Sequence, residues 1–115
     1  MAYPLVKIAN STNHKVKGKV KYMSSFCSND DYKIEPNSKW KAKHRGVCLL
    51  TEISADVEIG PNTFVTATSY KSSGTSYSNF AVIQTGEQSF ELTRIVNGAK
   101  DEIPEDYIEP TEQQN

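Results

Sequence analysis

Lysine alternates with smaller or apolar residues between positions 15 and 22, where every odd position is lysine and every even one is Val, Gly or Tyr. Successive side chains of a β-strand point to opposite faces, so this segment forms a strand with one charged and one apolar face. A helix would distribute the same lysines around its circumference. The pattern therefore predicts a strand that buries Val16, Val20 and Tyr22.

The same period of two recurs along most of the chain. Cations occupy the odd positions from 39 to 45, and apolar residues or Thr occupy those from 47 to 59, which we predict to be the central strand. Further strands are expected at residues 5–9, 32–34, 63–70, 80–84 and 89–96. Turn residues predict a hairpin at 10–13, tight turns at 36–38 and 60–62, and a second hairpin at 85–87. About eight short strands predict an all-β fold, a single antiparallel β-sandwich, with a small barrel as the alternative.

Two segments lack this alternation. Residues 69–79 are rich in hydroxyl side chains and include two tyrosines, which predicts a polar surface loop. The sequence from residue 99 is acidic and interrupted by prolines, which predicts a disordered or extended tail. We therefore expect one domain over residues 1–98 and an acidic C-terminal tail over residues 99–115.

The chain has no apolar run long enough to cross a bilayer, since its longest, at residues 47–50, falls far short of the roughly 20 residues required. The N-terminal residues lack the basic and apolar regions of a secretory signal. We therefore expect a cytoplasmic protein, or one released without a classical signal, and expect the glycosylation sequon at Asn10 to be unused.

Cys27 and Cys48 are the two cysteines of the chain. Reduced thiols are the favoured expectation, and a single disulfide is the alternative. A bridge would close a loop of about 22 residues and stabilise the fold by roughly 3 kcal/mol in the chain-entropy model.

Charge is segregated between the two halves of the sequence. Residues 1–50 hold ten Lys and Arg against three acids, whereas residues 51–115 hold three against eleven. The first expectation is that the halves attract each other within the fold, or that the tail balances the count. The alternative is a structural module that self-assembles through its opposite-charge halves and its acidic tail.

Catalytic and metal-binding patterns are absent from the sequence. His44 and Cys48 would lie about 13 Å apart along a strand, too far to share one ion. Nothing places Cys27 beside His14 or His44 as a nucleophile pair, and no glycine-rich phosphate loop is present. We expect no enzyme activity, no metal and no cofactor.

Two groups of residues are candidates for ligand binding. Lysines on neighbouring strands would form a cationic face for phosphates or anionic lipid headgroups, although lysine rows also serve solubility. The hydroxyl-rich loop would suit a glycan or a protein surface. Nucleic acid is disfavoured because the nearby aromatics, Tyr22 and Trp40, point inward by parity. The candidate ligand-binding residues are Lys17, Lys19, Trp40, Lys41, Lys43, Tyr70, Ser73, Thr75, Tyr77 and Asn79.

Several short segments resemble the aegerolysins, small β-sandwich proteins associated with membrane lipid recognition. These are the opening Met-Ala-Tyr, the first strand at residues 6–10, the run Tyr-Lys-Ile-Glu-Pro-Asn-Ser at 32–38, and Arg-Gly-Val-Cys at 45–48. The resemblance covers about half of the chain, which has one tryptophan where that family uses several. It implies a sandwich fold and lipid-surface binding. Together these features predict a non-catalytic binding module for a lipid headgroup, a glycan or a protein surface.

Overall fold

The computed structural model describes residues 3–95, apart from residues 25 and 44. The described part contains nine strands. Their bounds are β1 (Lys7–Asn10), β2 (Lys15–Tyr22), β3 (Asp30–Ile34), β4 (Lys39–Lys41), β5 (Leu50–Gly60), β6 (Thr63–Thr66), β7 (Tyr70–Thr75), β8 (Asn79–Gly86) and β9 (Ser89–Arg94). The predicted acidic tail and the domain boundary at residue 98 lie outside the described residues.

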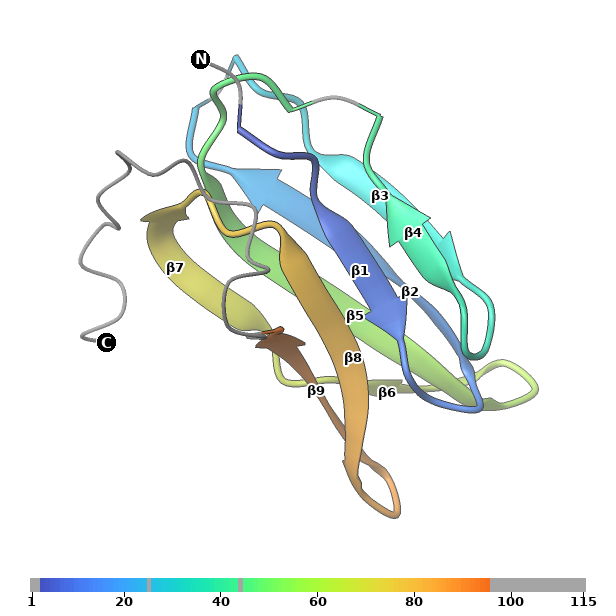
Figure 1. Cartoon of the computed structure of the whole chain (residues 1–115). Helices are drawn as coiled ribbons and strands as arrows, with labels where there is room; N and C mark the ends of the chain where they lie inside the picture. The colour runs from blue at the N-terminus through green and yellow to red at the C-terminus, as the bar shows by residue number, and fades with distance from the viewer. Residues whose placement is uncertain (1–2, 25, 44, 96–115) are drawn as a thin grey trace.

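The strands form two sheets that face each other (Figure 1). One sheet has the order β4-β1-β8-β9, and the other has the order β3-β2-β5-β6, with β7 also paired to β5. One hydrophobic cluster draws buried residues from both sheets. The all-β sandwich prediction is confirmed. It departs from uniform antiparallel pairing at β1 and β8, which run parallel.

Alternation along β2 and β5 builds much of the core. Val16 and Val20 of β2 are buried, as are Ile53 and Val57 of β5, while the lysines of β2 are exposed. β5 lies between β2 on one side and β6 and β7 on the other, so its predicted central position is confirmed. It begins at Leu50 rather than at residue 47, and its register with β7 shifts between Leu50 and Glu52.

Two of the predicted turns depend on asparagine. Asn37 and Asn62 adopt positive φ angles of 56° and 55°, a region that Asn tolerates better than most residues. The turn at Asn62 joins β5 to β6 within one sheet, whereas the turn at Asn37 carries the chain from β3 to β4 in the other sheet. The predicted turns at 36–38 and 60–62 are therefore present, with different roles.

The predicted hairpin at residues 10–13 is wrong. β1 and β2 belong to different sheets, so this segment crosses between the layers. The buried amide of Asn10 donates to the carbonyls of His14, Ile34 and Glu35, and its Oδ1 accepts from Thr12. These bonds fix the crossover against the end of β3. A glycan on Asn10 would require this network to open.

Candidate functional site

The two lysine rows do not form one cationic face. Lys17 and Lys19 lie on β2, whereas Lys41 lies on β4 in the opposite sheet, with Lys43 just beyond it. The chain crosses between the layers after β3, and this crossing separates the rows. All four lysines are exposed, but the expected continuous surface is absent from the described structure.

The lysine row of β2 lies beside a row of acids on β5. Lys15 is paired in register with Glu58, Lys17 with Asp56 and Lys21 with Glu52. The Lys21 ammonium lies 3.8 Å from the Glu52 carboxylate. The expected attraction between the oppositely charged halves is therefore present in this sheet.

Arg45 is not part of an exposed cationic face, contrary to the sequence pattern. Its side chain is only 4% exposed, and it bonds to five main-chain carbonyls and one hydroxyl. Its acceptors are the carbonyl oxygens of Pro4, Cys48, Thr75, Ser76 and Tyr77 and the Oγ of Ser78. The planar guanidinium, with five donors, ties the N-terminal segment to the turn between β7 and β8.

The predicted polar loop at residues 69–79 is largely a strand and a buried turn. Tyr70 to Thr75 form β7, and Asn79 begins β8. The side chains of Thr75, Ser76 and Ser78 are buried around Arg45, whereas Ser73 is exposed. Of the hydroxyl residues proposed as ligands, Ser73 faces solvent and Thr75 does not.

Aromatic side chains proposed for stacking already have partners. The ring of Tyr70 lies 4.8 Å from that of Phe80, and the guanidinium of Arg94 lies 3.3 Å from the centroid of Tyr77. Trp40 is half-buried, with its ring 5.4 Å from that of Tyr32. These contacts orient the rings within the protein, and Trp40 packs against the core as its parity indicated.

Two core tyrosines retain their protons more strongly than free tyrosine. Burial, followed by the hydrogen bond to Asp30 at 2.8 Å, raises the pKa of Tyr22 above its usual range. Burial, followed by the charge of Asp56, raises the pKa of Tyr32. Both phenols donate hydrogen bonds, Tyr22 to the Asp30 carboxylate and Tyr32 to the Ser54 carbonyl.

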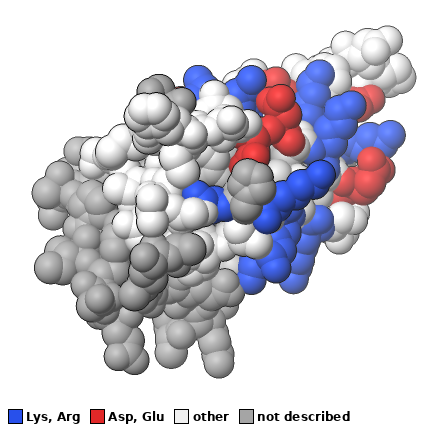
Figure 2. Space-filling view, turned by 90° about the horizontal axis from the view of Figure 1, so that it is seen from above, with Lys and Arg blue, Asp and Glu red and all other residues white. Residues whose placement is uncertain are grey.

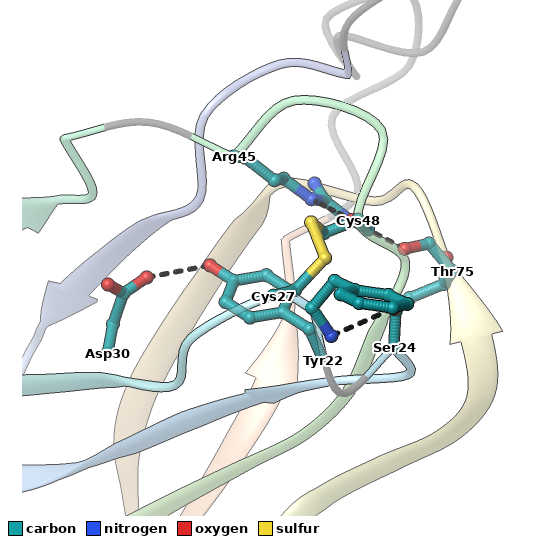
Figure 3. The surroundings of a disulfide bond; sticks show 8 residues. Tyr22, Ser24, Cys27, Asp30, Arg45, Cys48 and Thr75 are labelled. Atoms are coloured by element: carbon teal, nitrogen blue, oxygen red, sulfur yellow. Dashed lines mark hydrogen bonds between the residues drawn. A yellow bond between two sulfur atoms is a disulfide. The ribbon is translucent and has the colours of Figure 1, made fainter.

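Cys27 and Cys48 form a disulfide, so the favoured expectation of reduced thiols is wrong (Figure 3). Their Cα atoms are 6.2 Å apart, which is within the range that a bridge requires. The amide of Met23 also donates to the Leu49 carbonyl, at 2.8 Å, which pairs the two flanking segments. With two cysteines only one bridge within the chain is possible, but the sequence alone did not decide between that bridge and two thiols.

Three exposed apolar residues lie close in the sequence to the bridged cysteines. Phe26 and Val47 each directly precede a bridged cysteine and are 97% and 67% exposed, and Met23 is 54% exposed. We refer to Met23, Phe26 and Val47 as the disulfide tip. Strand alternation in the sequence does not single out these residues, although Phe26 and Val47 are apolar residues next to cysteine.

Lysines flank the disulfide tip. Lys21 ends the exposed row of β2 two positions before Met23, and Lys43 precedes the segment that contains Val47. Figure 2 looks down on the molecule from the top of Figure 1 and shows Lys and Arg side chains, with Asp and Glu among them, on one side of the view. The tip therefore combines exposed apolar groups with two lysines nearby in the chain, one of which, Lys21, is paired with Glu52.

No protein-family model, curated protein or solved structure matches this chain. Among residues 3–95, excluding 25 and 44, no helix is long and apolar enough to cross a membrane. The same residues contain no group of three or more His, Cys, Asp or Glu side chains arranged to hold a metal ion. The fold defines an all-β, two-sheet protein.

Proposed function

We propose that this protein is a non-catalytic binding module that docks on an anionic lipid surface through the disulfide tip. The observation that carries the proposal is the 97% exposure of Phe26 in a segment closed by the Cys27–Cys48 bridge. An aromatic ring held away from the core gains nothing from exposure to water. A bilayer interface would accept that ring without a complementary pocket.

The energetics favour weak, reversible attachment. Burying an apolar side chain of this size contributes about 1.5–3 kcal/mol, and a lysine close to an anionic surface contributes about 1 kcal/mol. The disulfide reduces the conformational entropy that the loop would lose on docking. The resemblance to aegerolysins, a family associated with membrane lipid recognition, agrees with this proposal.

Vesicle co-sedimentation tests the proposal. The purified protein is mixed with phosphatidylcholine vesicles that contain or lack phosphatidylserine, at low and high salt. We expect binding to the anionic vesicles, and we expect Phe26→Ser to weaken it about tenfold or more, since one buried aromatic ring is lost. Phe64→Ser is the matched control, because Phe64 is also an exposed aromatic residue but lies on β6.

Equal binding by the wild type and Phe26→Ser would refute a role for the tip, and absence of wild-type binding would refute the lipid surface as partner. The glycan and protein-surface alternatives would then require separate partners. Self-assembly is the remaining alternative, and it predicts a salt-sensitive oligomer in size-exclusion chromatography without vesicles. The β2–β5 charge pairs already bring opposite charges together within one molecule, which supports the binding module over assembly.

A further inference from the structure

A hollow of about 290 Å³ lies on the outer face of the sheet that contains β2. We refer to it as the Lys17–Lys33 groove. Its polar and aromatic lining consists of Lys15, Lys17, Lys33, Glu35, Glu58 and Phe64, drawn from β2, β5, β6, β3 and the residue that follows β3. The groove therefore spans the width of the sheet.

Two lysines in this groove face each other. Lys17 of β2 and Lys33 of β3 are directly paired in register, an arrangement that like charges disfavour. In the next pair of the same row, Lys19 lies opposite Asp31, with the charged atoms 3.2 Å apart. Within the described residues, neither Lys17 nor Lys33 has a carboxylate at ion-pair distance. On its other side Lys17 is in register with Asp56 of β5, whereas Lys33 lies on the edge strand β3 and has Lys17 as its register partner. An anion that contacts both ammonium groups would balance their charge.

Phe64 supplies an apolar surface in the same groove. Its side chain is 43% exposed, and the Lys17 ammonium lies 4.4 Å from the centre of its ring. A cation over an aromatic ring is held by the quadrupole of the ring, which favours one position for the Lys17 ammonium. The exposed part of the ring can pack against an apolar face of a ligand.

Glu35 and Glu58 limit which kinds of ligand the groove can accept. Glu58 is paired with Lys15, so this part of the groove has one positive and one negative group. A polyanion would meet repulsion from both carboxylates, whereas hydroxyl groups would donate hydrogen bonds to them. The groove therefore suits a compact ligand with one anionic group and several hydroxyls.

We propose that the Lys17–Lys33 groove binds a phosphorylated or sulfated sugar. The tetrahedral anion lies between the ammonium groups of Lys17 and Lys33, and the sugar ring packs on Phe64. The ring hydroxyls donate to Glu35 and Glu58. This site is additional to the proposed lipid surface, because the groove reaches Lys15 at the start of β2 whereas the tip follows its last residue, Tyr22, about 23 Å away.

Titration calorimetry with glucose 6-phosphate, glucose 6-sulfate, inorganic phosphate and glucose tests the proposal. We expect both esters to bind, inorganic phosphate to bind more weakly, and glucose to show no binding. Lys17→Gln and Lys33→Gln should each weaken ester binding about tenfold, since each removes one charge-assisted contact. Lys19→Gln is the matched control, because Lys19 lies on the same face but is paired with Asp31.

Phe64→Ala should weaken ester binding more than inorganic phosphate binding, because only the ester places a sugar ring against Phe64. Phe26→Ser should bind the esters like the wild type, which separates this site from the tip. Thermal unfolding of each variant shows whether it remains folded, and Lys17→Arg should retain binding. Equal affinity in Lys17→Gln, Lys33→Gln and Lys19→Gln would overturn the proposal, as would failure of the folded wild type to bind either ester.

Discussion

The phenol of Tyr32 passes close to Gly18 and donates a hydrogen bond to the Ser54 carbonyl, at 2.6 Å. Gly18 lies opposite Tyr32 in the register of β2 and β3, so the missing side chain at position 18 leaves room for the phenol. A Cβ built on Gly18 would overlap both the Ser54 carbonyl and the Tyr32 hydroxyl. One glycine thus permits a link between β3 and β5 across β2.

Gly18→Ala should therefore lower the free energy of unfolding by about 2–3 kcal/mol, because backbone or tyrosine must move to admit the methyl group. Urea denaturation measures the change. Gly60→Ala is the control, since a Cβ there has no neighbour closer than 3.9 Å, and we expect it to cost less than about 1 kcal/mol. Equal effects of the two substitutions would contradict this account of Gly18.

Replacing Cys27 and Cys48 together by serine should lower the free energy of unfolding by about 3 kcal/mol, because the bridge restricts a loop in the unfolded chain. Denaturation with and without a reductant provides a second measurement: reductant should destabilise the wild type and leave the double variant unchanged. A wild type that reacts with a thiol reagent before denaturation, without reductant, would show that the bridge is not formed.

Arg45→Met should destabilise the fold by about 2–5 kcal/mol, because buried carbonyls around the guanidinium lose their donors. Arg45→Lys should recover part of this loss, since an ammonium has three donors rather than five. Lys43→Met is the control, because Lys43 is exposed two positions away. Stability measured by urea denaturation should fall in the order wild type, Arg45→Lys, Arg45→Met, and any other order would contradict the role given to Arg45.

The raised pKa of Tyr32 predicts loss of stability in alkali. The folded protein holds this proton more tightly than the unfolded chain, so the stabilisation is complete below a pH of about 10 and declines as the pH rises above it. The decline approaches 1.4 kcal/mol per pH unit for one such group. Tyr32→Phe should be less stable at neutral pH, because its hydrogen bond is lost, but should show a shallower alkaline decline. Parallel pH profiles for the two proteins would contradict the prediction.

The strands of this protein could be predicted from the sequence wherever one face of the strand is exposed to solvent and the other is buried. Alternation of Lys with Val and Tyr in β2, and of Glu or Asp with Ile and Val in β5, records such a difference directly in the sequence. The same rule failed at Arg45, which has the parity of an exposed cation but is buried among carbonyls. Alternation identifies the two faces of a strand, and it does not apply where the strand has ended.

The candidate site was harder to anticipate than the strands. The hydroxyl-rich segment had the composition of a binding loop, yet Thr75 and Ser78 are buried, and both accept hydrogen bonds from Arg45. The sequence pattern does not identify Phe26 as a site residue, since a single aromatic residue in a polar stretch forms no alternation of apolar and polar positions. Its exposure, beside a cysteine bridged to a distant part of the chain, is visible only in the tertiary structure.

The sequence by itself determined an all-β protein with a lysine-faced strand and a central strand, because side-chain alternation is a local property with a period of two. The tertiary structure alone decided which strands share a sheet, that β1 and β8 run parallel, and that Lys17 lies opposite Lys33. It also decided the pairing of Cys27 with Cys48 and the burial of Arg45. These features join residues far apart in the chain, and their geometry depends on how the two sheets pack around one core.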